Sequence, residues 1–196
     1  MWSTATLTRV ASFPVTKDTT YPASLGGGVF DLSFSPNGRL LAIVGIDDFI
    51  RVFSLPGFSL VDVFEGLNSM DAVAFSPNGR LLALGNAAGD VYLFAVPPVV
   101  KNNNLGGQTE LGAFAASSKT IWSVQFLSNT MLIAGGTDGV ARFWRVPSGK
   151  NWNVTIPVQA VATHAGLISA MSYSAPLGLL TTASPAGSRV WQTNPA

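Results

Sequence analysis

Residues 34–42 read FSPNGRLLA, and residues 75–83 repeat the same nine residues forty-one positions later. Nine identical residues at one offset do not arise by chance in a chain of 196 residues. A fixed period in this range is the mark of stacked-repeat architectures. We therefore divide the chain into structural units, and this stretch marks the register of each unit.

The centre of the repeated stretch predicts a tight turn between two strands. Asn-Gly at positions 37–38 and 78–79 supplies the positive backbone φ values that a short hairpin needs, and the preceding proline cannot continue a central strand. In the first unit, strands are expected at residues 29–35, 40–46, 49–55 and 60–64. Because no helical period appears in the chain, the predicted fold class is all-β.

The pattern recurs twice more in a weaker form. Each unit has apolar residues five and two positions before the aromatic residue that ends its first strand. These sets are Val29, Leu32 and Phe34; Met70, Val73 and Phe75; Ile121, Val124 and Phe126; and Ile168, Met171 and Tyr173. Because spacings of five and two differ in parity, a bulge is expected in each first strand. Units three and four align without gaps, at an offset of forty-seven, from Phe126 to Trp191.

Repeats of about 40 to 50 residues, with SPNGR after an aromatic residue and DGVARFW near the end, resemble WD40 repeats. The resemblance covers residues 29–191 and implies a β-propeller of about four four-stranded blades around a central axis. The expected units are residues 29–66, 67–117, 118–164 and 165–196, which form one propeller domain. An outer strand and a loop, in residues 1–28, are expected to precede them.

The ends of the chain leave two architectures open. In the family, the outer strand of a blade follows the Trp of its third strand; this chain ends shortly after Trp191 and begins with Trp2 and one strand. The ends could pair within one chain, in a small closed ring, or with a partner chain that completes a partial propeller. We favour the second architecture, because an open arc exposes apolar blade faces. The chain could also be a piece of a longer protein.

The resemblance also implies structural residues within the blades. The best WD40 units hold a His, a Ser or Thr, an Asp and a Trp in a buried hydrogen-bond network. This chain keeps only parts of it: Asp47 in unit one; Asp138 and Trp144 in unit three, with Ser117 at the His position; and His164 and Trp191 in unit four, with Pro185 at the Asp position. Because incomplete buried networks are costly, we expect apolar packing to stabilise the blades. We interpret His164 as structural rather than catalytic.

Composition argues against several classes of protein. Charged residues make up 11%, well below the usual share of about 25%, which fits either a surface rich in Ser, Thr and Asn or burial in a larger assembly. A net charge of +1 without a basic stripe argues against nucleic-acid binding. No apolar run reaches the roughly 18 residues of a membrane span. No signal peptide is recognised, and an intracellular, cytoplasmic location is expected.

No group of residues predicts catalysis. A single histidine and no cysteine argue against a zinc site and exclude disulfides. No Gly-x-Ser-x-Gly elbow surrounds a serine, and Asp47-Asp48 is interpreted as a turn rather than a catalytic carboxylate pair. We therefore expect no enzyme activity, no cofactor and no metal.

The residues that remain are candidates for protein binding. In WD40 propellers, partners often dock on the face where the first strands begin. By position this face holds Phe30, Asp71, Trp122 and Ser169, together with Thr137 beside the turn of unit three. Exposed aromatic residues often carry the binding energy of an interface, although Phe30 and Trp122 could instead pack into loops. The insertion at residues 96–112 is expected to be a loop or an arm.

The expected function is therefore a non-catalytic WD40-repeat scaffold that mediates protein–protein interactions as a subunit of a multi-protein complex. Its partner is expected to be a protein, either a second copy or another propeller chain, and not a nucleic acid. The alternatives are a regulatory or trafficking propeller of exchange-factor or coat type, and an enzyme that uses the propeller face.

Overall fold

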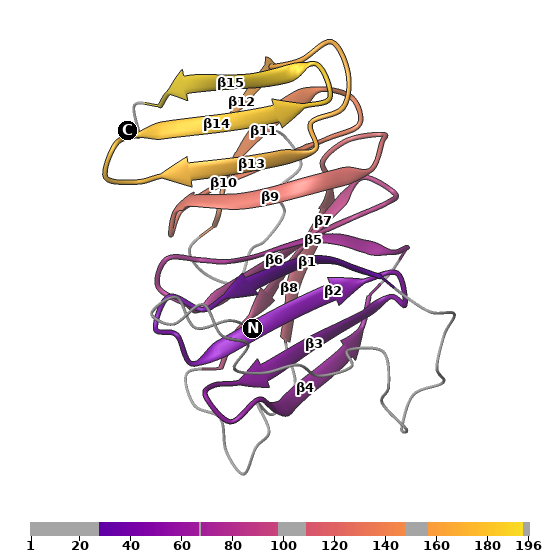
Figure 1. Cartoon of the computed structure of the whole chain (residues 1–196), viewed down its shortest axis with the longest axis vertical. Helices are drawn as coiled ribbons and strands as arrows, with labels where there is room; N and C mark the ends of the chain where they lie inside the picture. The colour runs from indigo at the N-terminus through magenta and orange to yellow at the C-terminus, as the bar shows by residue number, and fades with distance from the viewer. Residues whose placement is uncertain (1–27, 67, 98–108, 148–156, 194–196) are drawn as a thin grey trace.

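The computed structural model describes residues 28–66, 68–97, 109–147 and 157–193. The expected N-terminal outer strand lies outside the described residues, as do residues 98–108 of the insertion. The described residues form fifteen β-strands and no helix, in four antiparallel sheets (Figure 1). The all-β prediction with four units is therefore confirmed, and we call the sheets blades one to four.

Each blade is a meander of strands that follow one another in the sequence. Blade one contains β1 (Val29–Phe34), β2 (Leu40–Gly45), β3 (Phe49–Ser54) and β4 (Ser59–Glu65). Blade two contains β5 (Met70–Phe75), β6 (Leu81–Asn86), β7 (Asp90–Ala95) and β8 (Thr109–Ala115). Blade three contains β9 (Ile121–Ser128), β10 (Met131–Gly136), β11 (Val140–Arg145) and β12 (Gln159–Ala162). Blade four contains β13 (Ala170–Ser174), β14 (Leu179–Ser184) and β15 (Gly187–Gln192).

The prediction of a loop over residues 96–112 was wrong at its end, because β8 begins at Thr109.

The duplicated SPNG segment builds the same turn in blades one and two. In blade one, the Ser35 hydroxyl donates to Asn37 Oδ1 at 2.8 Å and accepts from the Leu40 amide at 2.8 Å. Asn37 Oδ1 also accepts from the Arg39 amide at 3.0 Å. Only the glycine of Asn-Gly has positive φ, +68° at Gly38 and +69° at Gly79, so the expectation for the asparagines was wrong. A left-handed glycine lets the hairpin close without the steric cost that a Cβ would bring.

Apolar packing between consecutive blades forms the core. In blades two to four, the aromatic residue of the first strand and the apolar residues two and five positions before it pack on the middle strands of the preceding blade. In blades two and three these residues are at most 8% exposed, as Met70, Val73, Phe75, Ile121, Val124 and Phe126 show. Glycines make room for two of these side chains: a Cβ on Gly85 would lie 2.6 Å from Cγ2 of Ile121, and one on Gly135 would lie 2.9 Å from Cδ1 of Ile168.

Polar side chains join the first strands of consecutive blades, which are the inner edges of their sheets. Between blades one and two, the Val73 amide donates to Asp31 Oδ2 at 2.9 Å, and the Phe75 amide donates to Ser33 Oγ at 3.2 Å. Between blades three and four, the Met171 amide donates to Ser123 Oγ at 3.2 Å. These bonds satisfy edge amides that would otherwise lack a partner inside the stack.

The interface between blades three and four contains a cavity. On the outer strands of the first two interfaces, Phe64 packs on Phe94, with ring centroids 4.9 Å apart, and Phe114 packs on Trp144 at 5.0 Å. The corresponding residue of blade three is Val161. It pairs with Ala141, as Phe64 pairs with Ile50 in blade one. A cavity of about 430 Å³ opens there, beside Trp191. The smaller side chains account for this space.

The stack is open. Packed pairs of strands join blade one to two, two to three and three to four, and blades one and four lie at opposite ends (Figure 1). Leu32 and Phe34 of blade one are 52% and 48% exposed, although their equivalents in blades two and three are buried. Val190 of blade four is 64% exposed. The described residues therefore form an open arc of four blades and not a closed ring.

The gapless alignment of units three and four was wrong in its middle. Leu132 pairs with Phe126 and Trp144, and Leu180 pairs with Tyr173 and Trp191. The outer positions are forty-seven residues apart, because 173 − 126 and 191 − 144 are both 47, but the two leucines are 180 − 132 = 48 apart. In blade four, the connection from Tyr173 to Leu180 is therefore one residue longer than its equivalent in blade three, and the connection from Leu180 to Trp191 is one residue shorter. The two changes cancel in the sequence.

Adding one methyl group tests the packing between blades. Gly85→Ala places a Cβ against Ile121, which is 1% exposed and cannot move aside, so we expect the free energy of unfolding to fall by about 1–3 kcal/mol. Gly166→Ala is the matched control, because nothing lies within 4 Å of its added Cβ. Urea denaturation measures both variants. Equal stability of the two would contradict the packing described.

Candidate protein-binding face

Phe30, Asp71 and Trp122 occupy the same position in the first strands of blades one, two and three. Each is the extra residue of a β-bulge, since the strand pairing skips it. The shifts lie between Val29 and Asp31 in β1, between Met70 and Ala72 in β5, and between Ile121 and Ser123 in β9. The bulge predicted from the spacing is confirmed in these strands. A bulge re-aims its side chain, so the three residues leave the ordinary alternation of the sheets.

The bulges bring two aromatic rings together across blade two. The rings of Phe30 and Trp122 meet edge to face, with centroids 6.4 Å apart and planes at 89°. Trp122 Nε1 donates to Thr137 Oγ1 at 3.1 Å, which fixes the indole. Phe30 and Trp122 nevertheless remain 42% and 37% exposed. They pack on each other and still present apolar surface to solvent.

Asp71 lies on β5, the strand between the two rings, and is only 4% exposed. Its Oδ1 accepts from the Ser69 hydroxyl at 3.2 Å. Burial raises the pKa of Asp71 to about 6, with a smaller contribution from the nearby charge of Asp48, and the Ser69 hydrogen bond opposes the shift. We call Phe30, Asp71, Trp122 and Thr137 the aromatic face. It combines exposed rings with a buried carboxyl that resists ionisation.

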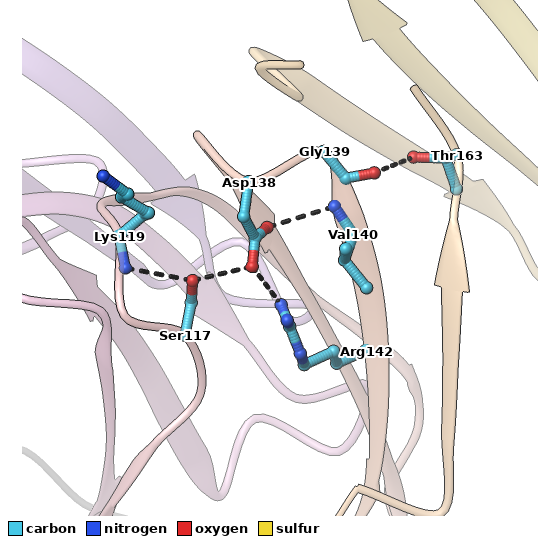
Figure 2. A network of polar contacts seen from close by, with 7 residues as sticks. All are labelled: Ser117, Lys119, Asp138, Gly139, Val140, Arg142 and Thr163. Carbon is cyan, nitrogen blue, oxygen red and sulfur yellow. Dashed lines mark hydrogen bonds and ion pairs between the residues drawn. The ribbon is translucent and has the colours of Figure 1, made fainter. Parts of the chain in front are cut away.

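Asp138 organises the turn before β11 (Figure 2). Its Oδ1 accepts from the Val140 amide at 3.0 Å, and its Oδ2 accepts from the Ser117 hydroxyl at 2.8 Å and from Arg142 Nη1 at 2.6 Å. Burial is the largest single influence and raises the pKa of the carboxyl. The bonds from Val140, Arg142 and Ser117, with the charge of Arg142, together outweigh it and hold the pKa of Asp138 below its usual value.

Asp47 forms the equivalent pair in blade one. Its two carboxylate oxygens accept from Arg51 Nη1 at 3.1 Å and Arg51 Nη2 at 2.6 Å, and the two side chains are 5% and 4% exposed. The neighbouring Asp48 instead accepts from the Ser69 amide at 2.6 Å. The two carboxylates of the Asp-Asp pair thus have separate partners, as expected for a turn. The arginine partners of Asp47 and Asp138 were not predicted.

The family model for the WD domain, G-beta repeat (WD40) matches residues 16–54 and 108–145. These two segments of the chain are WD40 repeats. Both matches end one residue after the aromatic residue of a third strand, Phe53 or Trp144, as the repeat register predicts. No curated protein matches the chain. WD40 repeats are typical of protein-interaction scaffolds.

Blade four keeps three of the four side-chain types of the WD40 network. His164 Nε2 lies 3.0 Å from Thr182 Oγ1, and Trp191 Nε1 donates to the same hydroxyl at 3.0 Å. Thr182 was missed because the gapless alignment hid the true register. Its equivalent in blade three is Ala134, and Trp144 Nε1 accordingly has no hydrogen-bond partner in the described part of the chain. Pro185 lies four residues before Arg189, as Asp138 lies four residues before Arg142, and it supplies no carboxylate.

Ser169 is not joined to the aromatic face. It precedes β13, and both its amide and its hydroxyl donate to the Ala183 carbonyl of its own blade, at 2.9 and 3.2 Å. The described pairs of β13 show no bulge. Of the five residues expected on the binding face, Phe30, Trp122 and Thr137 are joined by contacts, and Asp71 lies on the strand between them.

No group of three or more His, Cys, Asp or Glu side chains in the described ranges is close enough together to hold a metal ion. No helix among the described residues is long and apolar enough to cross a membrane.

The buried carboxyl gives the aromatic face a pH signature. Asp71 has a folded pKa of about 6, above its ordinary value of 3.8, so it lowers stability as pH rises from about 4 to about 6. We expect Asp71→Asn to stabilise the chain above pH 6, by on the order of 1–2 kcal/mol, and to make no difference below pH 4. Denaturation curves at pH 4 and pH 7.5 measure this. A stability gain that is the same at both pH values would contradict the assignment.

Proposed function

We propose that this chain is a non-catalytic WD40 scaffold, a subunit of a multi-protein complex, and that it binds a protein partner through the aromatic face. One observation carries the proposal. Phe30 and Trp122 come from blades one and three, meet in a defined geometry and yet stay 42% and 37% exposed. Aromatic side chains of this kind, fixed and partly exposed, are the usual anchors of protein interfaces.

The charge beside the rings indicates the chemistry of the partner. Asp71 is buried with a second acid, Asp48, close enough to raise its pKa. Arg51 of blade one is already held by both oxygens of Asp47. A lysine or arginine side chain from a partner would be attracted by the charges of Asp71 and Asp48 and by the faces of the rings. We therefore propose a partner that presents a basic residue to the aromatic face.

The two open ends of the arc are candidates for a second binding surface. Leu32 and Phe34 at one end and Val190 at the other are about half exposed or more, at positions built for packing between blades. Apolar faces of this kind usually mark interaction surfaces. We propose that a second copy or another propeller chain covers them. We also propose an intracellular, cytoplasmic location, which suits a chain without cysteine.

Removing the two rings tests the proposal. In cells that produce the tagged chain, we expect a stoichiometric protein partner to co-purify, and native mass spectrometry to give its mass. Phe30→Ala with Trp122→Ala should lower the bound fraction at least tenfold, because the anchors of the interface are lost. Thermal denaturation confirms that the variant is folded.

The matched control is Leu177→Ala with Val158→Ala, which removes two side chains that are 65% and 53% exposed and lie outside the aromatic face. We expect this control to keep the partner. Absence of any partner, or equal loss of the partner in both double variants, would contradict the proposal.

A further inference from the structure

Blade four keeps an arginine whose carboxylate partner is missing from the chain. In blades one and three, the arginine two residues before the third-strand aromatic binds an aspartate in the preceding turn, as Arg51 binds Asp47 and Arg142 binds Asp138. Arg189 holds the same place before Trp191. The turn before it, residues 184–187, reads SPAG and contains no acid. Among the described residues, no carboxylate pairs with Arg189.

The side chains that hold Asp138 have counterparts in blade four. Ser117, on the loop after β8, corresponds to His164, on the loop after β12. Arg142 corresponds to Arg189, whereas the Val140 amide has no free counterpart, because Gly187 pairs with Ser184 and closes a shorter hairpin. Blade four therefore keeps a side chain on the loop and a guanidinium. In blade three, the same two positions bind one carboxylate oxygen of Asp138.

His164 has a ring nitrogen available for this site. Its Nε2 meets the Thr182 hydroxyl, which already accepts from Trp191 Nε1. The hydroxyl hydrogen of Thr182 can therefore be donated to Nε2, and the neutral ring then carries its own hydrogen on Nδ1. Among the described residues, nothing hydrogen-bonds Nδ1. The ring can donate this hydrogen to a ligand.

A cavity lies where these groups meet. It has a volume of about 360 Å³ and is lined by His164, by Arg189, by the turn residues 184–188 and by the loop residues 165–167. Arg189 Nη1 donates to the Thr163 carbonyl, which orients the guanidinium. The cavity is open to solvent on one side, so a chain segment of a partner can enter it.

We propose that this cavity binds a carboxylate, supplied by an aspartate or glutamate side chain of an acidic peptide segment. The planar guanidinium of Arg189 matches a carboxylate in geometry and charge. Arg142 already shows this pairing in the same register, with a distance of 2.6 Å to Asp138. The bound carboxylate would thus take the position that Asp138 takes in blade three. The site does not depend on the aromatic face or on the function proposed above.

The single histidine of the chain makes the test direct. In a ¹H–¹³C spectrum of the full chain, every histidine ring signal belongs to His164. The probes are acetyl-Gly-Asp-Gly-amide and its isostere acetyl-Gly-Asn-Gly-amide, titrated at constant ionic strength, with inorganic phosphate as a third probe. We expect a saturable shift of the His164 signals with the aspartyl peptide and none with the asparaginyl peptide.

Two charge variants separate the site from general electrostatics. Arg189→Gln should weaken the aspartyl peptide at least tenfold, because it removes the paired cation. Arg145→Gln, at an exposed residue of β11, removes the same charge elsewhere and should leave the affinity unchanged. If Arg189→Gln does not fold, Pro185→Asp replaces it. This variant puts a carboxylate into the turn and should block the peptide while the chain stays folded.

Several results would overturn the proposal. They are an absence of saturable shift, an equal shift with the asparaginyl peptide, an equal loss of affinity in Arg145→Gln and Arg189→Gln, or full peptide binding by folded Pro185→Asp. Tighter binding of phosphate than of the aspartyl peptide would also overturn it, because the ligand class would then be different.

Discussion

The structure depends on the packing of the first strand of one blade against the face of the preceding blade. Hydrogen bonds within a blade hold a single sheet together. A single sheet of this kind has two apolar faces, however, and is not stable with both exposed to water. Phe75 and Met70 cover blade one, Phe126 and Ile121 cover blade two, and Ile168 covers blade three. A chain built in this way is stabilised mainly by contacts between neighbours, as in other repeat architectures.

The packing of the first strands also explains where the residues of the aromatic face lie. In blades one to three, the bulge sits between the two apolar residues that lie five and two positions before the aromatic residue of the first strand, because this spacing needs an extra residue. That extra residue is pushed out of the packing, and in three blades it is Phe30, Asp71 or Trp122. The aromatic face is therefore a by-product of how the blades pack. Its chemistry depends on which residues occupy the bulge.

Much of this architecture can be predicted from the sequence, because it follows from local spacing. The repeat of Phe34 at Phe75 gives the register, and the offsets of five and two give the bulge. The contact between Phe30 and Trp122 could not be predicted, since it joins blades that are not consecutive. The raised pKa of Asp71 follows from burial and also lies beyond sequence reasoning. Thr182 was missed because an insertion and a deletion cancel in the alignment of units three and four.

The central claim is that the four blades form an open arc, and the two identical FSPNGRLLA stretches test it within one chain. Phe75 is 8% exposed between blades one and two, and Phe34 is 48% exposed at the free end. At concentrations where native mass spectrometry shows a monomer, Phe75→Ala should lower the free energy of unfolding by about 3–5 kcal/mol. Phe34→Ala should lower it by less than about 1 kcal/mol. Equal losses would show that Phe34 is buried in a closed ring, and would contradict the account.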